Sequence, residues 1–460
     1  MISYAVFFAI SLALFVIAAV SPRMLAYTIA GCAGIPVTLF ISGFSGTEAA
    51  LGGLGAQAVY LLIIFSAMLL GVVTTHRRSL KVAIKFPLFI AFIIFCSASI
   101  AWSENIAHGM RFLIKLVSPL LMMMLCYATA TRTEFAERLE RSVLICCGAV
   151  MALSFLNYAA GGIDVASARV DWSSRSILTA PYMSPANYSF LMASGAILSL
   201  NKFMSFRRAI HLALCLVFSA CVFLAFTRIS IGGLSIALTC SLFLLSKSNL
   251  TRILLPLALI IGLVSSFALY EPLRQRMFFS GSSVDISTSN VQKLSESIDT
   301  SGRTLLWERA FKKFDDNNIL IGAGLGSVDG WLADKLGGTR LHSEYLRLYF
   351  DVGLIGLSLY VLFLIFCLIK SISLLGKART KQTKYYASLS ISMLIFFSIT
   401  LFTDNSLNYV TELGFYVFIP FALLFSSLNR NFAPKSVIRP ATYEGKKALR
   451  EHVPTSGASC

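Results

Sequence analysis

The sequence predicts an all-α, polytopic integral membrane protein with about 12–13 membrane-spanning helices and one large loop outside the membrane. Three observations support this class. Of the 460 residues, 57% are hydrophobic and only 13% are charged, and the mean hydropathy is +0.76. Apolar runs of about 16–22 residues fill most of the chain, and each can cross a hydrocarbon core of about 30 Å. The runs lack the period-two alternation of barrel strands, so we expect helices with internally paired backbone groups.

The predicted helices fall into two groups separated by a long polar stretch. Merging the first two runs would leave 12 spans instead of 13. The runs before the stretch are 2–20, 25–43, 57–74, 86–102, 112–130, 143–160, 182–200, 209–226, 229–246 and 253–270, and those after it are 348–369, 386–403 and 413–428.

Lysine and arginine are unevenly distributed among the loops. Alternate short loops and the C-terminal tail hold 24 of the 39 basic residues, which places them in the cytoplasm. The net charge of +17 therefore reflects topology and not nucleic-acid binding, because no basic segment is interleaved with aromatic residues in a soluble module. Nine of the ten cysteines lie inside predicted helices, so neither a disulfide nor a cysteine metal site is expected in the outer loops.

The chain divides into four parts. Residues 1–270 hold ten predicted helices, 271–346 form the large non-cytoplasmic loop, 347–428 hold the remaining helices, and 429–460 form a polar tail that we expect to be disordered in the cytoplasm. Segment 303–314 has apolar residues on adjoining faces and predicts an amphipathic helix on the membrane surface. A second outer loop, 161–181, carries Arg169 and Arg175.

The window from Arg340 to Gly356 places a histidine and several charges on the outer end of an apparent membrane helix. At 100° per residue, Gly353 and Gly356 return to the direction of His342, so one face would carry an imidazole and a smooth glycine strip. A second face would carry a stripe of alternating charge, Arg340, Glu344, Arg347 and Asp351. Ionisable groups at membrane depth usually face a cavity or a site, so we expect function here.

His342 is the candidate for proton transfer. Its near-neutral pKa suits proton abstraction from a hydroxyl, and either Glu344 or Asp404 is positioned in sequence to orient it. A structural histidine is the alternative.

Arg228 and Arg303 are candidates for binding an anion. Arg228 stands alone between two apolar runs, where its guanidinium either binds phosphate or reaches lipid headgroups. Arg303 opens the amphipathic segment, with Trp307 one turn later, and is either a second anion contact or a surface charge.

Other chemistry has weaker support. One histidine with scattered carboxylates is not a recognisable metal-ligand set. Gly322, Gly324 and Gly326 lack the strand and helix that surround a dinucleotide fingerprint, so they predict a tight turn, with a phosphate-binding nest as the alternative. We therefore expect neither a metal nor another cofactor.

The motifs resemble those of the O-antigen ligase and Wzy-type polysaccharide polymerase superfamily. His342-Ser343, followed by Gly353 and Gly356, matches the family's histidine signature, although serine stands where asparagine is commoner. The order along the chain is also similar, over roughly 86–426. The remaining similar elements are Gly302-Arg303-Thr304 with Trp307, the glycine turn 322–326, Thr227-Arg228, Tyr182 to Asn187 and Trp102 to Asn105.

The resemblance implies a GT-C-like fold in the bacterial inner membrane and an inverting, metal-independent glycosyl transfer at its periplasmic face. The donor would be an undecaprenyl-diphosphate-linked glycan, and the acceptor a second lipid-linked repeat or lipid A-core. His342 would receive the acceptor proton, and Arg228 and Arg303 would hold the diphosphate. Further candidates for substrate contact are Arg340, Glu344, Arg347, Arg169, Arg175 and Trp307.

Three functions remain open at this stage. The Gly302-Arg303-Thr304 motif is closer to ExoQ-type exopolysaccharide proteins, which favours a polymerase. An O-antigen ligase that passes the glycan to lipid A-core is the alternative within the superfamily. A flippase or transporter would instead place charged residues near the bilayer midplane in two corresponding halves, and no such repeat is evident.

Overall fold

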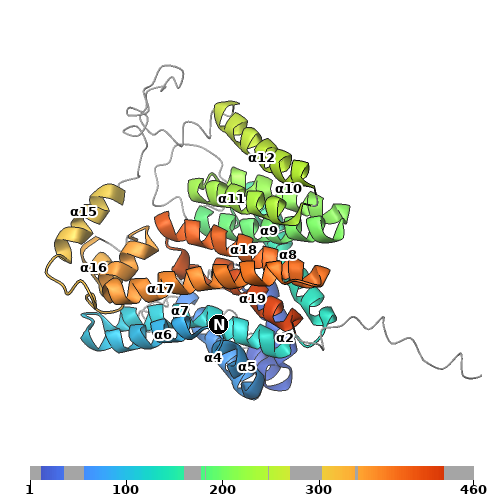
Figure 1. Cartoon of the computed structure of the whole chain (residues 1–460). Helices are drawn as coiled ribbons and strands as arrows, with labels where there is room; N and C mark the ends of the chain where they lie inside the picture. The colour runs from blue at the N-terminus through green and yellow to red at the C-terminus, as the bar shows by residue number, and fades with distance from the viewer. Residues whose placement is uncertain are drawn as a thin grey trace, which may run out of the picture.

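A computed structural model describes residues 12–35, 56–159, 178–181, 183–246, 248–269, 303–336 and 340–428. Within these ranges the chain is helical and contains no β-strand, which confirms the all-α fold class. The helices pack side by side in one bundle, and α15 and α16 lie together at one end of it (Figure 1).

Residues 12–20 are helical, and ten labelled α-helices follow before the large loop. They are α2 (Pro22–Cys32), α4 (Ala56–Thr74), α5 (His76–Ala83), α6 (Pro87–Ser99), α7 (Ile106–Thr129), α8 (Thr133–Ala159), α9 (Pro185–Phe206), α10 (Ala209–Leu224), α11 (Arg228–Leu245) and α12 (Asn249–Leu269).

Five α-helices and two short turns of helix follow. The α-helices are α15 (Arg303–Lys313), α16 (Ser327–Leu336), α17 (Glu344–Gly376), α18 (Lys381–Thr403) and α19 (Phe415–Ser427). Between α18 and α19 lie the 3₁₀ turn η4 (Ser406–Asn408) and the π-helical turn η5 (Val410–Gly414), and a further 3₁₀ turn, η2 (Ile100–Trp102), extends α6.

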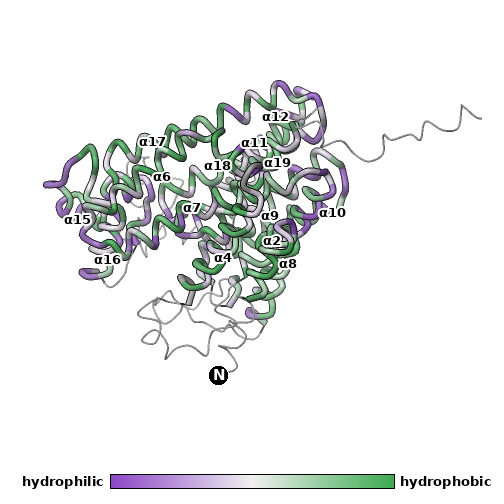
Figure 2. Tube along the Cα trace, turned by 90° about the horizontal axis from the view of Figure 1, so that it is seen from below, coloured by the Kyte–Doolittle hydropathy of each residue, from purple (hydrophilic) through white to green (hydrophobic). Residues whose placement is uncertain are grey.

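The described part of the chain forms a multi-pass membrane protein. Six of its helical segments are long and apolar enough to span a membrane, and four shorter apolar helices accompany them. Hydrophilic residues gather at the α15–α16 end and near the far ends of α10 and α12, with hydrophobic helices between them (Figure 2). This distribution fits a bundle that crosses the bilayer along its length. The total of 12–13 spans stays a prediction.

Three of the spans form the centre of the bundle. Of the residues in the apolar window of each span, 89% are buried in Val410–Ser427 and 72% in α7 and in α18, whereas only 28% are buried in α8. Aromatic rings fill this centre, with Phe89, Phe363 and Phe418 stacked within about 6 Å of one another. The outer helices leave large apolar side chains exposed, among them Ile145, Leu216 and Ile261.

Several helix boundaries differ from the sequence prediction. α7 and α8 begin earlier than predicted because their first turns are polar and amphipathic, and a hydropathy window does not include them. α9 begins at Pro185. Ser184 is its N-cap, and the Ser184 side chain accepts a hydrogen bond from the Asn187 backbone N–H. α16 was not predicted, because its ten residues lie in a polar loop.

The predicted continuous helix from His342 to Gly356 is wrong. Ser343 is the N-cap of α17, so His342 lies outside the helix, with φ of 57°. Gly353 then interrupts the helix with φ of 61° and ψ of −167°, a conformation open only to glycine. Neither residue has helical geometry, so the predicted alignment of His342 with the two glycines on one helical face does not exist.

Some predictions lie outside the described residues. They include parts of the predicted helices 2–20 and 25–43, most of the loop 161–181 with Arg169 and Arg175, the residues 271–302, and the tail 429–460.

Candidate active site

His342 lies in a polar corner formed by the residues that follow α18. Its backbone N–H donates to Asn405 Oδ1 at 3.1 Å, and its ring Nδ1 is 3.2 Å from Asn405 Nδ2. The Asp404 Oδ1 carboxylate oxygen lies 4.0 Å from the same Nδ1. The histidine side chain is 38% exposed, so the ring is held on one side and open on the other.

Asp404 is itself fixed by its neighbours. Its Oδ1 accepts from the Asn405 backbone N–H at 2.7 Å and from the Tyr409 hydroxyl at 3.3 Å. Burial raises the pKa of Asp404, although the Asn405 amide and Arg303 oppose this shift. Of the two carboxylates that the sequence offered as orienting groups, Asp404 is the one beside the imidazole. Glu344 instead accepts from the Leu407 backbone N–H at 3.2 Å.

The imidazole of His342 is neutral over the physiological pH range. Burial, followed by the nearby cations Arg303 and Arg340, lowers the pKa of His342 to about 4. A neutral imidazole can accept a proton. Asn405 Nδ2 can only donate, so its contact with Nδ1 places the ring proton on Nε2. The other tautomer, with the proton on Nδ1 directed toward Asp404, frees Nε2 as the proton acceptor.

Two hydrogen bonds attach helix α15 to the surroundings of His342, one to the end of α18 and one to the residue that precedes His342. Arg303 Nη1 donates to the carbonyl of Thr403, the last residue of α18, at 2.7 Å. The Trp307 indole N–H donates to the Leu341 carbonyl at 2.8 Å. The motif Arg303-x-x-x-Trp307 therefore brings one cation to the corner and holds it there.

Arg228 is the half-buried first residue of α11. α11 runs antiparallel to α18, with Ser241 Oγ 2.7 Å from Ser392 Oγ and Gly233 packed against Phe396. Continued at 1.5 Å per residue, this register places Arg228 near the end of α18, at the same end of the bundle as Arg303 and His342.

The predicted stripe of alternating charge divides into a buried cluster and an exposed residue. Arg347 is 2% exposed; it pairs with Asp329 and lies 3.4 Å from Glu344 and 3.9 Å from Asp351. Its guanidinium also stacks over the Phe112 ring, 3.4 Å from the centroid. Arg340, by contrast, has a side chain that is 48% exposed, and it lies 3.9 Å from Asp329.

The glycine turn 322–326 binds a carboxylate of the protein itself. The backbone N–H groups of Gly326 and Val328 donate to the two Asp351 carboxylate oxygens at 3.1 and 2.9 Å, and that of Gly324 donates to the Asp351 carbonyl at 2.8 Å. These donors are occupied, so this geometry leaves the alternative of a phosphate-binding nest without support.

The three glycines also permit close backbone packing. A Cβ at Gly324 would lie 2.5 Å from the Ser103 Cα, and one at Gly326 would lie 2.2 Å from the Gly109 nitrogen. The Trp102–Asn105 loop, the glycine turn and Gly353 are far apart in the sequence but form one contact region, which holds α16 against α7 and α17.

Sequence reasoning missed several residues of the site. Asn405 and Tyr409 are uncharged and lie more than 60 residues after His342, and Asp329 belongs to the helix that was not predicted.

Asn187, from the Pro185-Ala-Asn187 segment, donates to the buried Glu412 carboxylate at 3.1 Å, inside the π-helical turn. Such turns are frequent at functional sites, but the sequence carries no signal for them.

Comparison with known families agrees with these motifs. Residues 212–361 match the family model described as O-Antigen ligase, and this range contains Arg228, Arg303 and His342. A search of curated proteins gave no match. Within the described residues, no group of three or more His, Cys, Asp or Glu side chains could hold a metal ion. The match over residues 212–361 thus supports the resemblance to the O-antigen ligase and Wzy-type superfamily.

Proposed function

We propose that the protein polymerises undecaprenyl-diphosphate-linked oligosaccharide repeats at the periplasmic face of the inner membrane. The observation that carries this proposal is a neutral, half-exposed histidine held beside Asn405, Asp404 and Arg303 at one end of a membrane bundle. The family match supports a glycosyl transfer from a lipid-linked glycan.

In this proposal the acceptor hydroxyl oxygen attacks the anomeric carbon of the donor. The bond between that carbon and the diphosphate oxygen breaks, and the lipid diphosphate leaves with the bonding electrons. The reactive form is the tautomer whose ring proton lies on Nδ1, directed toward Asp404, and His342 Nε2 takes the hydroxyl proton. One new glycosidic bond forms, with inversion, and the reaction requires no metal.

Arg228 and Arg303 would stabilise the leaving diphosphate. A guanidinium 4 Å from a phosphate charge contributes about 4 kcal/mol of gross Coulomb attraction at an effective dielectric of about 20. Arg340, exposed near the same corner, remains a candidate for sugar or diphosphate contact. Because Arg347 and Glu344 are buried, we propose that they hold the start of α17 and do not touch the substrate.

An O-antigen ligase is the second candidate, and the description of the matching family favours it. The two reactions share the donor and differ in the acceptor. Purified protein in nanodiscs with the lipid-linked repeat alone should form a ladder of polymers if it is a polymerase. Product that forms only when lipid A-core is added would overturn the polymerase and support the ligase.

Single Ala variants at Arg228, Arg303 and His342 test the mechanism in the same assay. We expect each to lose most activity at normal protein level, and a chelator to leave the wild-type rate unchanged. Arg309→Ala is the matched control, because Arg309 is exposed on the same helix as Arg303. Normal product from all three variants would remove this mechanism.

A further inference from the structure

Lys115 is an internal cation that the proposed reaction does not use. It lies in the first half of α7, and its Nζ donates to Asn408 Oδ1 at 2.7 Å. Among the described residues, it has no carboxylate within 4.0 Å of its ammonium. An ammonium with a single strong protein partner makes that one bond important.

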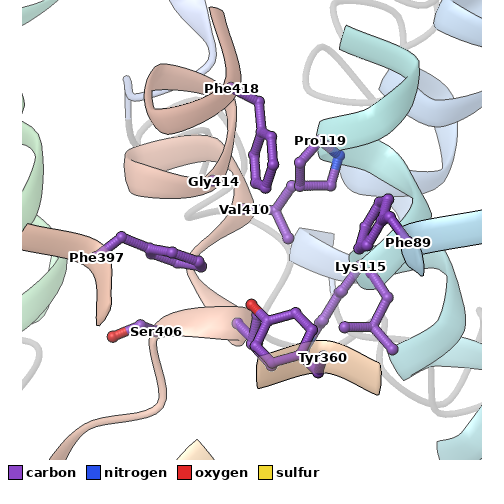
Figure 3. Close-up of a pocket in the computed structure, with 11 residues that line it drawn as sticks. Phe89, Lys115, Pro119, Tyr360, Phe397, Ser406, Val410, Gly414 and Phe418 are labelled. Atoms are coloured by element: carbon purple, nitrogen blue, oxygen red, sulfur yellow. The ribbon is translucent and has the colours of Figure 1, made fainter. Parts of the chain in front are cut away.

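Asn408 depends on the same bond. Its Nδ2 is buried and has no hydrogen-bond partner within the described part of the chain, so the Lys115 ammonium is the side-chain contact that fixes the amide. Lys115 lines a cavity of about 20 Å³ whose other walls are mainly apolar, with the Tyr360 hydroxyl directed inward (Figure 3).

Asn408 ends the 3₁₀ turn that begins directly after Asn405. The Asn408 backbone N–H donates to the Asn405 carbonyl at 2.9 Å, so the two residues are joined across one short turn. Asn405, in turn, holds both the backbone and the ring of His342. A continuous path of hydrogen bonds therefore leads from Lys115 in the membrane bundle to the imidazole.

We infer that Lys115 is a positioning residue for the proposed transfer: by holding Asn408, it fixes the turn that orients His342 and Asp404. This inference rests on the proposed function, because it assigns Lys115 no separate reaction. The turn has a second attachment, because the Leu407 backbone N–H donates to Glu344, so we expect the fold to stay intact when Lys115 is changed.

The test compares kcat, KM for the donor and the unfolding temperature of four variants in nanodiscs. Lys115→Met and Asn408→Ala should each lower kcat about ten- to hundredfold with KM and unfolding temperature nearly unchanged, since small displacements of a catalytic group cost this much. Asn408→Asp keeps an oxygen acceptor for Lys115 and should retain near-wild-type kcat. The double variant Lys115→Met with Asn408→Ala should be no slower than the slower single variant.

Tyr360→Phe is the matched control, because it changes the same cavity without touching the turn, and we expect wild-type kcat. If the fold-losses in kcat of Lys115→Met and Asn408→Ala multiply in the double variant, the two residues act independently and the inference is overturned. Normal kcat in Lys115→Met would also overturn it. Loss of kcat only in proportion to a fall in folded protein would also overturn it. Failure of the proposed function looks different: wild-type protein would form no product, or His342→Ala would be as active as wild type.

Discussion

Two polar groups lie at the start of α17, and their surroundings are opposite. The corner of His342, Asp404 and Asn405 is held from one side and open on the other. The cluster around Arg347 contains more charge, yet it is sealed between α7, α16 and α17. Exposure, and not charge content, therefore distinguishes the group suited to chemistry from the group that joins helices.

The strongest test of this contrast is His342→Ala. We expect the rate of glycosyl transfer to fall about 10²–10⁴-fold, the usual contribution of a general base. The unfolding temperature should stay close to that of the wild type, because the ring is half-exposed. A variant within twofold of the wild-type rate would show that the open corner is not the reactive one.

Arg347→Ala should have the opposite profile. Removing the cation leaves buried carboxylates without their partner, which destabilises a protein by about 3–5 kcal/mol. The measurement is thermal unfolding in detergent, with Arg340→Ala as control; because Arg340 is exposed, its change should stay within about 0.5 kcal/mol. Stable Arg347→Ala protein that binds donor poorly would mean that the cluster contacts substrate after all.

Gly353→Ala tests the interruption of α17 at Gly353, which follows the His342 corner and the Arg347 cluster in the chain. The backbone at this position is open only to glycine, and a Cβ would lie 2.4 Å from the Leu320 carbonyl oxygen. We expect a loss of about 1–3 kcal/mol in unfolding free energy. Gly148→Ala is the control, since a Cβ there meets nothing within 4 Å and alanine favours helix. If the two variants unfold with equal free energies, the interruption of α17 does not require glycine at position 353.

The smallest expected effect is a shift in pH dependence. The reaction needs neutral His342, so activity should be present above pH about 4 and lost as pH falls through that value. Arg303→Gln removes one of the charges that keep this pKa low, so the acid limb should move toward higher pH. The measurement is the rate of the residual activity as a function of pH. An acid limb at the same pH as in the wild type would show that another group controls the titration.

The sequence predicts most of the fold, because apolar runs of membrane length are a local signal. The sequence also singles out His342, Arg303 and Trp307, since they occupy a recognisable motif; their roles stay predictions. Asn405 was missed because an uncharged side chain in a short loop carries no local signal, and its contact with His342 spans 63 residues.

The break at Gly353 was misread for a different reason. Glycine inside an apolar helix permits either close packing or interruption, and sequence periodicity cannot choose between them. The choice depends on residues 319–324, whose backbone groups pair with residues 350–355.

Those backbone pairs make chain length more important than side-chain identity around the break. Leu354 and Ile355 donate to the carbonyls of Ile319 and Leu320, bonds that many side chains would allow. One residue inserted between Gly353 and Arg347 would instead turn the outer helical segment by about 100° and advance it about 1.5 Å. The Arg347 cluster and the His342 corner would then lose their registration with the bundle together, so substitutions should be tolerated in this segment far better than insertions or deletions.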